Sequence, residues 1–262
     1  MTEQRFVFDE VAELYDHTRP RYPEELVDDL VSHSGVRAGG RVLEIGCGTG
    51  QLTASLAARG FRMTCLEPGL SMAALARRGL ARFPEVEVQS LTFEAWPLER
   101  GAFDLVVSAQ AFHWVDPAVA WPKSADSLRP GGSLAVIGNA PVEEESPARS
   151  AIDAAYEKHA PSLAASRMPA CWYAQNELLQ DLFARSGRFA PVAAFRRPWA
   201  ETYSAGRYLD LMRTHSPHRL LAESQRESLL AAIREAIDGH GGSFEVRYEA
   251  RMYLARVREA DE

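Results

Sequence analysis

The ten-residue stretch RVLEIGCGTG, residues 41–50, constrains the fold of this chain more than any other part of it. Val42, Leu43 and Ile45 form a short aliphatic run, which predicts a buried strand of a parallel sheet. Three glycines follow, and the apolar spacing of residues 51–59 predicts a helix packed on that sheet. A strand, a glycine turn and a helix in this order place bare backbone N–H groups at the carboxyl edge of a sheet, where ligands bind.

The spacing of the glycines separates the candidate ligands. A dinucleotide fingerprint, G-x-G-x-x-G, needs its third glycine one position later than Gly50. Here the pattern is E-x-G-x-G-x-G, and Glu44 would suit an ammonium group better than a phosphate. With this pattern the stretch resembles the class I S-adenosylmethionine-dependent methyltransferases, whose strand, loop and helix hold the amino-acid end of the cofactor. A glycine-rich turn that binds no ligand is the alternative.

The resemblance implies a set of contacts to the methionine part of the cofactor. These cofactor-binding residues are Glu44, Gly46, Cys47, Gly48 and Gly50. We interpret Cys47 as a small packing residue of the loop and not as a nucleophile.

A second apolar strand, residues 61–66, ends at Glu67. An acid about 20 residues beyond the glycines is where a βαβ unit presents a carboxylate to both ribose hydroxyls. Ser71 is predicted to cap a helix that ends at Arg82. The resemblance adds Pro68 to the cofactor contacts and places Met72 against adenine; a core methionine is the alternative reading.

The loop of residues 91–98 follows a short third strand, residues 86–88. Many relatives have an aspartate where Thr92 aligns, to receive the adenine amino group, and its absence puts that side-chain contact in doubt. The Thr92 hydroxyl or the backbone N–H of Phe93 is the expected substitute.

The fourth strand, residues 102–108, leads into the sequence AQAFHWVD. Residues just past this strand line the crevice of a doubly wound sheet, so we expect Ala109 and Gln110 near the sulfonium end of the cofactor. His113 and Trp114 are the candidate catalytic residues on the acceptor side, because a histidine of near-neutral pKa can take a proton from an acceptor. The alternative is a histidine bonded to backbone beside a core tryptophan.

The N-terminal region predicts helix from Phe6 to Ser34, interrupted at Pro20 and Pro23. The stretch FDEVAELYDHTRPRYP resembles a segment that folds over the cofactor in a small-molecule branch of the family, similar to methyltransferase type 11. This implies that Tyr15 and Arg19 bind cofactor, with Arg19 paired to its carboxylate. A core tyrosine and a surface arginine are equally compatible with the pattern.

The remaining pattern predicts a helical cap and the end of the sheet. Trp172 and Tyr173 are candidate walls of an acceptor pocket. Helices are expected over residues 118–128, 150–159, 175–186, 208–214 and 224–237; strands are expected over residues 133–138, 189–199 and 244–257, the last of them antiparallel as in relatives.

We therefore predict an α/β fold with a doubly wound, mostly parallel seven-stranded sheet, the Rossmann-like methyltransferase fold, and a helical cap. Its expected parts are an N-terminal segment over the cofactor (residues 1–40), a cofactor-binding core (41–140), a helical cap for the acceptor (141–188) and the last strands and helices (189–262).

Composition limits the partners and the compartment. The net charge of −7 argues against a general nucleic-acid binder, and Arg185, Arg188, Arg196 and Arg197 are interpreted as a solvated or salt-bridged face. The three cysteines form no C-x-x-C, which fits a reducing compartment without disulfides or zinc. No signal peptide or membrane span is expected, so the predicted location is the cytoplasm. No metal is expected, because His215 and His218 have no third ligand.

The predicted function is transfer of a methyl group from S-adenosylmethionine to a small-molecule acceptor, leaving S-adenosylhomocysteine. The protein would act as a monomer or homodimer. A methyltransferase-like binding protein without turnover is the second hypothesis, and a nicotinamide oxidoreductase, disfavoured by the glycine spacing, is the third.

Overall fold

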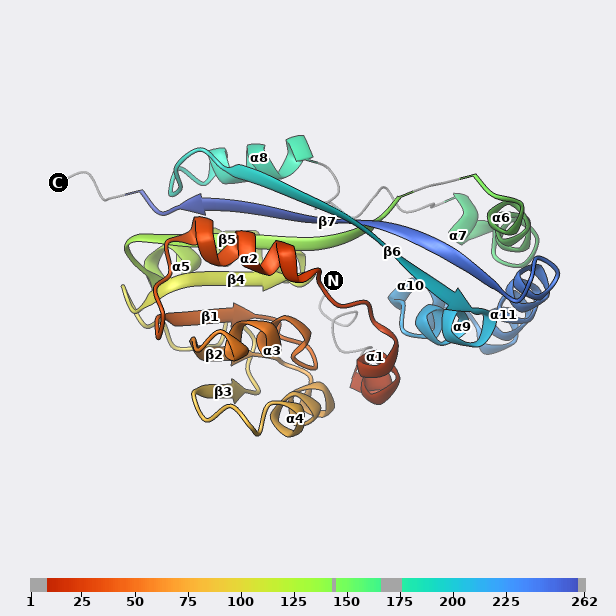
Figure 1. Ribbon diagram of the computed structural model, residues 1–262, viewed down its shortest axis with the longest axis horizontal. Coiled ribbons are helices and arrows are strands. Elements are labelled where there is room, and N and C mark those ends of the chain that lie inside the picture. Colours follow the sequence, from red (N-terminus) through yellow and green to blue (C-terminus); the bar gives the residue numbers. More distant parts are fainter. Residues whose placement is uncertain (1–8, 143–144, 166–175, 259–262) are drawn as a thin grey trace.

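The computed structural model describes residues 9–142, 145–165 and 176–258. A seven-stranded sheet with the order β3-β2-β1-β4-β5-β7-β6 runs through the molecule (Figure 1). Strands β1 to β5 pair in parallel, whereas β7 is antiparallel to β5 and to β6. The strands are β1 (Arg41–Ile45), β2 (Arg62–Leu66), β3 (Val86–Gln89), β4 (Phe103–Ala109), β5 (Leu128–Pro141), β6 (Ala193–Ser204) and β7 (Ser243–Arg256). The predicted fold class is confirmed.

Helices cover both faces of the parallel part of the sheet. Val42 belongs to the core under α2 (Glu24–Ser34) and α3 (Gln51–Ala58). Its neighbour Leu43 belongs to the opposite core, under α5 (Pro117–Ser127) and α8 (Asn176–Arg185). Because successive side chains of a strand point to opposite faces, a continuous apolar strand such as β1 serves two cores at once.

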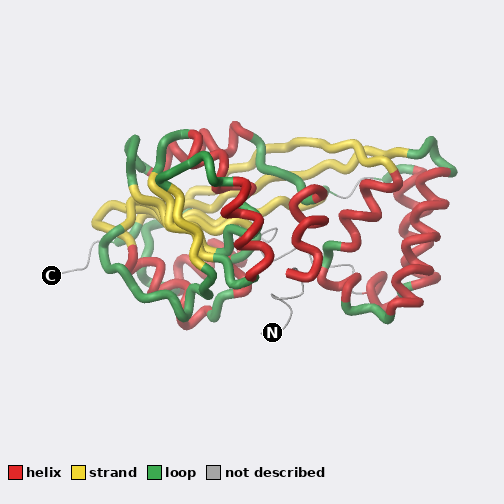
Figure 2. Tube along the Cα trace, turned by 90° about the horizontal axis from the view of Figure 1, so that it is seen from below, coloured by secondary structure: helices red, strands yellow, loops and turns green. Residues whose placement is uncertain are grey.

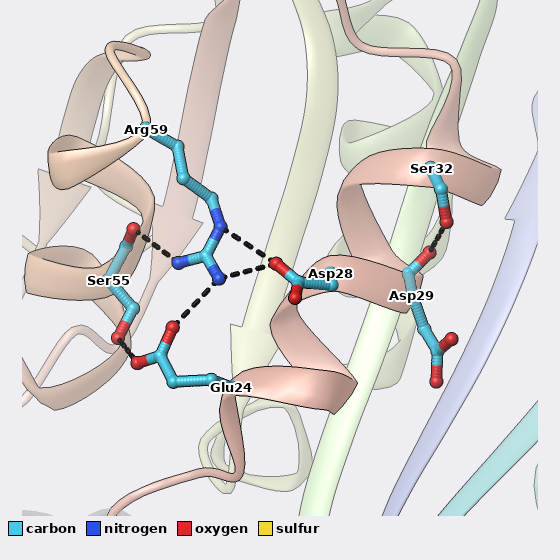
Figure 3. Close-up of polar contacts among 6 residues, drawn as sticks. All are labelled: Glu24, Asp28, Asp29, Ser32, Ser55 and Arg59. Atoms are coloured by element: carbon cyan, nitrogen blue, oxygen red, sulfur yellow. Dashed lines mark hydrogen bonds and ion pairs between the residues drawn. The ribbon is translucent and has the colours of Figure 1, made fainter.

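A charged cluster on the surface joins α2 to α3 (Figure 3). The Arg59 guanidinium lies 2.7 Å from the Glu24 carboxylate and 2.6 Å from that of Asp28. The Ser55 hydroxyl also donates to Glu24, at 3.0 Å. Arg59 therefore joins the two helices, although exposed ion pairs of this kind contribute little to stability.

A helical lobe extends beyond the core, at the far end of the long strands β6 and β7 (Figures 1 and 2). It has its own apolar cluster, in which Ile152 of α6 packs with Leu229 and Ile233 of α11 and with Tyr203 of β6. The helices of this lobe are α6 (Pro147–His159), α7 (Pro161–Ala165), α9 (Ala205–Arg213), α10 (Ser216–Arg219) and α11 (Glu223–Asp238).

The N-terminal segment lies between the core and the helical lobe. A short 3₁₀ turn, η2 (Asp9–Val11), precedes α1 (Ala12–Thr18), and α1 contacts both α4 (Leu70–Gly79) and α9. The helix ends before the expected interruption at Pro20 and Pro23, and α2 begins directly after Pro23. No helix of the described ranges is both long and apolar enough to cross a membrane.

Several predicted element boundaries are wrong. β5 spans Leu128–Pro141, so it begins five residues before and ends three residues after the strand expected over residues 133–138. β6 spans Ala193–Ser204, later than expected, and Phe189 makes only an isolated bridge to Val257. α9 begins at Ala205 because the Ser204 side chain accepts from the Arg207 N–H and starts the helix there.

The four arginines interpreted as a solvated or salt-bridged face all form ion pairs, which confirms the salt-bridged reading. Arg185, Arg188, Arg196 and Arg197 pair with Asp181, Asp126, Glu249 and Asp29, in that order.

Candidate active site

A cavity of about 1150 Å³ lies between the carboxyl edge of the parallel strands and the helical lobe. Gly46 and Glu67 line it from the core, Tyr15 from α1, and Tyr156 and His218 from the lobe. The cavity is therefore bounded by segments that are far apart in sequence. A small pocket of about 30 Å³ adjoins the glycine loop.

The glycine loop leaves β1 with three glycines of positive φ. The N–H groups of Gly46 and Cys47 donate to the Leu66 carbonyl, at 2.8 and 3.0 Å, which ties the loop to the end of β2. A Cβ on Gly46 would lie 2.3 Å from the Ala111 Cβ, so this position excludes every side chain. A Cβ on Gly48, whose φ is +60°, would lie no closer than 3.6 Å to any atom. A side chain at Gly48 would therefore touch Gln51, Met72 and Tyr15 at ordinary contact distance, and Gly48 lines the cavity with backbone alone.

Glu67 follows β2 and is 8% exposed on the cavity wall. Its Oε2 accepts from the Gly48 N–H at 3.0 Å, and its Oε1 accepts from the Gly69 N–H at 2.9 Å. Burial raises the pKa of Glu67, while these two backbone hydrogen bonds lower it. The two N–H donors fix the orientation of the carboxylate, and each oxygen keeps a lone pair for a further donor.

Glu44 lies beneath the loop, is 1% exposed, and lines the small pocket together with Tyr15, Arg19 and Gln110. Its Oε2 accepts from the Thr53 hydroxyl at 2.6 Å. Burial, opposed by this hydrogen bond and reinforced by the negative charge of Glu67, raises the pKa of Glu44 to about 7. The carboxyl group is therefore poised to ionise beside a cation at neutral pH.

The N-terminal segment connects the glycine loop to the lobe through its side chains. The Arg19 guanidinium lies 4.8 Å from the centre of the Tyr15 ring. It donates to the Thr214 hydroxyl at 2.9 Å and to the Thr214 carbonyl at 2.8 Å. Asp16 accepts from the Thr49 hydroxyl of the glycine loop at 2.7 Å. Both predicted residues, Tyr15 and Arg19, line the cavity.

The prediction that Ser71 caps the start of α4 is wrong. Ser71 does not cap the helix; its N–H and that of Met72 donate to Asp9, at 2.6 and 3.0 Å. The helix begins at Leu70, and an acid from the N-terminal segment satisfies its free N–H groups. Sequence reasoning missed Asp9, because a cap supplied from 62 residues away leaves no local pattern.

Four predicted residues lie on the next stretch of the cavity wall: Pro68, Met72, Thr92 and Phe93. Met72 is 4% exposed and Phe93 is 2% exposed, so both also belong to the core. The Thr92 hydroxyl accepts from the Ala95 N–H at 3.2 Å and starts the following turn. These residues form a mainly apolar slot beside Glu67.

The end of β4 carries the remaining predicted residues, Ala109, Gln110, His113 and Trp114, all on the cavity wall. Gln110 has a φ of +55° and is the only non-glycine of the described ranges with a positive φ. Such strain is concentrated at functional sites. The His113 ring lies 4.5 Å from the Trp114 ring, and burial lowers the His113 pKa to about 4. The expected near-neutral pKa of His113 is therefore wrong for the ligand-free protein.

The structure thus brings most of the predicted site residues to one cavity. Glu44 and Cys47 lie at the adjoining small pocket. Gly50 lines neither space; it caps α3, and a Cβ there would lie 3.0 Å from Leu80. Trp172 and Tyr173 lie outside the described residues. Within the described ranges, no cluster of three or more side chains could hold a metal ion.

Sequence reasoning missed the lobe side of the cavity as a site. Its polar residues include Arg149, Asp153, Tyr156, His215 and His218. In the sequence, His215 and His218 suggest only a metal pair, and no local pattern indicates that α6 and α10 face the cavity at the end of β4.

Part of this chain matches known methyltransferases in sequence. Residues 43–136 match the family described as methyltransferase domain. The chain is 41% identical over 125 residues to an uncharacterized methyltransferase of Mycobacterium tuberculosis. The aligned region covers 48% of this chain and 49% of the relative. It is 38% identical over 111 residues to trans-aconitate 2-methyltransferase of Deinococcus radiodurans, 41% of each chain. The chain spans about half the length of the curated relatives it matches first.

The fold of the chain is also similar to solved methyltransferase structures. A candidate type II methyltransferase of Anaeromyxobacter dehalogenans superposes with a TM-score of 0.61 at 22% identity, covering 91% of this chain and 97% of that one. At this identity the likeness establishes the fold alone.

Proposed function

We propose that this chain, whose core belongs to the class I S-adenosylmethionine-dependent methyltransferases, moves a methyl group to a small-molecule acceptor. One observation carries the proposal. The buried Glu67 and the backbone of Gly48 line the same cavity as His113 and the lobe, which supports a cofactor site continuous with an acceptor space.

The residues present fit the cofactor. Gly48, which lines the cavity without a side chain, would lie along the methionine part, and Glu44 in the small pocket suits its ammonium group. Glu67, already oriented by two backbone donors, has the free lone pairs that two ribose hydroxyls require. Met72 and Phe93 offer an apolar slot for the adenine ring.

S-adenosylmethionine, when bound, supplies a methyl group that a positively charged sulfur has already activated. The chain's own residues therefore need mainly to orient the acceptor and to exclude water. α1 covers the cavity from one side, held to the glycine loop through Asp16 and to the lobe through Arg19. Gln110, whose φ of +55° is strained, lines both the small pocket beside Glu44 and the large cavity.

We assign His113 and Trp114 to the acceptor side. With a pKa of about 4, His113 is neutral at pH 7 and offers a ring nitrogen as a hydrogen-bond partner. It is a weak proton acceptor in that state, so we assign it a positioning role and not that of a general base. The Trp114 ring beside it adds an aromatic wall.

Calorimetric titration with S-adenosylhomocysteine and, separately, with NAD tests the cofactor. The proposal expects binding of the first and none of the second. NAD binding without S-adenosylhomocysteine binding would instead support a nicotinamide oxidoreductase.

A screen of acceptors with methyl-labelled cofactor then tests turnover. The relative named trans-aconitate 2-methyltransferase makes small carboxylic acids one class to include. Labelled product from any small acceptor supports an enzyme. Tight cofactor binding with no product from any acceptor class favours the alternative, a methyltransferase-like binding protein.

A further inference from the structure

Thr214 joins the helical lobe to the N-terminal segment. It follows α9, which lies beside α1 (Figure 1), and it is 0% exposed. Its hydroxyl donates to the Leu211 carbonyl at 2.7 Å, so the same oxygen accepts the hydrogen bond from Arg19 Nε at 2.9 Å. The Thr214 carbonyl accepts from Arg19 Nη2 at 2.8 Å. Thr214 therefore fixes one edge of the Arg19 guanidinium.

Two further features hold the guanidinium in this place. The Tyr15 ring lies on one of its faces, with 4.8 Å between the guanidinium carbon and the centre of the ring. Thr214 is also the C-cap of α9, and the C-terminus of a helix attracts a positive charge. Because a guanidinium is planar, contacts on one face and along one edge set the direction in which its other N–H groups point.

Arg19 also lines the small pocket beside the glycine loop. Among the described residues around this pocket, Arg19 is the only base and Glu44 is the only acid. The pocket therefore offers opposite charges to the carboxylate and the ammonium group of an amino acid. A guanidinium has five N–H donors, so Arg19 can bind Thr214 and a carboxylate at the same time.

We propose that Thr214 is a positioning residue for cofactor binding, which orients Arg19 toward the carboxylate of the methionine part. This inference rests on the proposed function. Thr214 is not among the described residues that line the small pocket or the large cavity, so it would act through Arg19 and not by touching the ligand. The lobe thereby takes part in binding the cofactor as well as the acceptor.

The first test replaces the Thr214 side chain. Thr214→Val keeps its shape but removes the acceptor for Arg19 Nε, while the Leu211 carbonyl keeps its bond from the Thr214 N–H at 3.0 Å. Calorimetry should show about tenfold weaker binding of S-adenosylhomocysteine to this variant. Thr214→Ser keeps the hydroxyl and should restore native affinity. Native affinity of Thr214→Val would overturn the inference.

The matched control is Thr202→Val, at an exposed threonine of β6 that lies outside both the small pocket and the large cavity. It removes a threonine hydroxyl from the same end of the molecule and should bind S-adenosylhomocysteine as the native protein does. An equal loss in Thr202→Val and Thr214→Val would refute the role of Thr214.

A double-mutant cycle with Arg19→Ala shows whether Thr214 acts through Arg19. Arg19→Ala should weaken S-adenosylhomocysteine binding, and adding Thr214→Val to it should cause no further loss. Additive losses would show that Thr214 acts by another route. Native affinity of Arg19→Ala would remove Arg19 from the cofactor site, and the inference with it.

A second ligand separates positioning from general damage to the fold. 5′-Methylthioadenosine keeps the adenosine and the sulfur but has neither the amino nor the carboxyl group. Its affinity should be the same for the native protein, Thr214→Val and Arg19→Ala. If Thr214→Val weakens both ligands equally, its role is structural and the inference fails.

Arg19→Lys keeps the test decisive if Thr214→Val does not fold. Lysine keeps the charge but has no planar fork to hold the Thr214 hydroxyl and carbonyl together. We expect weaker binding of S-adenosylhomocysteine and unchanged binding of 5′-methylthioadenosine. Native affinity of Arg19→Lys for both ligands would overturn the inference and leave the cofactor site in place. Failure of the native protein to bind S-adenosylhomocysteine would instead overturn the proposed function, and this inference with it.

Discussion

Replacing Glu44 by glutamine should make the ligand-free protein more stable at pH 8 and weaken its hold on the cofactor. Glu44 is 1% exposed at the end of β1, and burial is the main reason that its pKa rises from 4.5 to about 7. Glutamine keeps the carbonyl oxygen that the Thr53 hydroxyl needs at 2.6 Å, but carries no charge. The substitution therefore isolates the effect of ionising this buried group.

The magnitude follows from linkage. Between pH 4.5 and pH 7 the folded protein keeps a proton on Glu44 that the unfolded chain releases. The stabilising contribution of this protonation is complete below pH 4.5 and is lost as the pH rises through 7. Each unit of pKa difference corresponds to about 1.4 kcal/mol, so the loss amounts to about 3 kcal/mol by pH 8.

Urea unfolding at pH 5, 6, 7 and 8 measures this effect. Glu44→Gln should be close to the native protein at pH 5 and about 3 kcal/mol more stable at pH 8. Glu85→Gln, at an exposed acid before β3, is the control and should follow the native curve. Parallel pH dependence of Glu44→Gln and the native protein would refute the burial argument.

The Glu44→Gln variant also tests whether Glu44 binds the ligand or only supports the fold. Glu44→Gln removes the negative charge that would attract the ammonium group of the ligand. Calorimetry at pH 8 should therefore show weaker binding of S-adenosylhomocysteine to Glu44→Gln than to the native protein. A more stable variant that binds less well indicates a buried charge retained for function. Unchanged affinity would make Glu44 a structural residue only.

Three further predictions concern the other cavity residues. Glu67→Ala should cost about 1–3 kcal/mol of calorimetric binding energy for S-adenosylhomocysteine by leaving ribose hydroxyls unpaired, and native affinity would remove Glu67 from the site. Gly48→Ala and Gly60→Ala both force a side chain onto a positive φ, at similar cost in thermal stability, but only Gly48→Ala should weaken binding tenfold or more; equal affinities would mean that no ligand lies on Gly48. His113→Ala should slow methyl transfer without loosening the cofactor, and because its pKa is about 4 we expect no rate step from His113 between pH 6 and 9. A step near pH 6.5 that His113→Ala abolishes would contradict this.

The parallel core could be predicted from sequence because its signals are local. β1 (Arg41–Ile45) contains the predicted aliphatic run of Val42, Leu43 and Ile45, and α3 ends one residue before the predicted end, at Ala58. A strand buried on both faces is apolar at most positions, with Glu44 the buried exception in β1, and glycine is favoured in the following turn where the backbone has a positive φ. These requirements lie within ten residues of each other and are visible without the fold.

The edge of the sheet and the lobe could not be predicted as well, because long-range pairing decides them. β6 is an edge strand whose side chains are largely exposed, so it lacks the apolar alternation that marks a strand, and it tolerates Pro198. The predicted strand ended at Trp199, where its side chain still packs against Tyr248 of β7. The bonds from Asp9 to α4 and from Arg19 to Thr214 likewise join segments 62 and 195 residues apart, so no local pattern indicates them.

The central claim is that backbone after β1 and the carboxylate after β2 together hold the methyl donor. A crystal structure of the protein grown with S-adenosylhomocysteine tests this most directly. The account predicts the methionine part of that ligand along Gly46 and Gly48 and its ribose hydroxyls on Glu67. The ligand lying elsewhere, with Glu67 still bonded only to the Gly48 and Gly69 N–H groups, would contradict it.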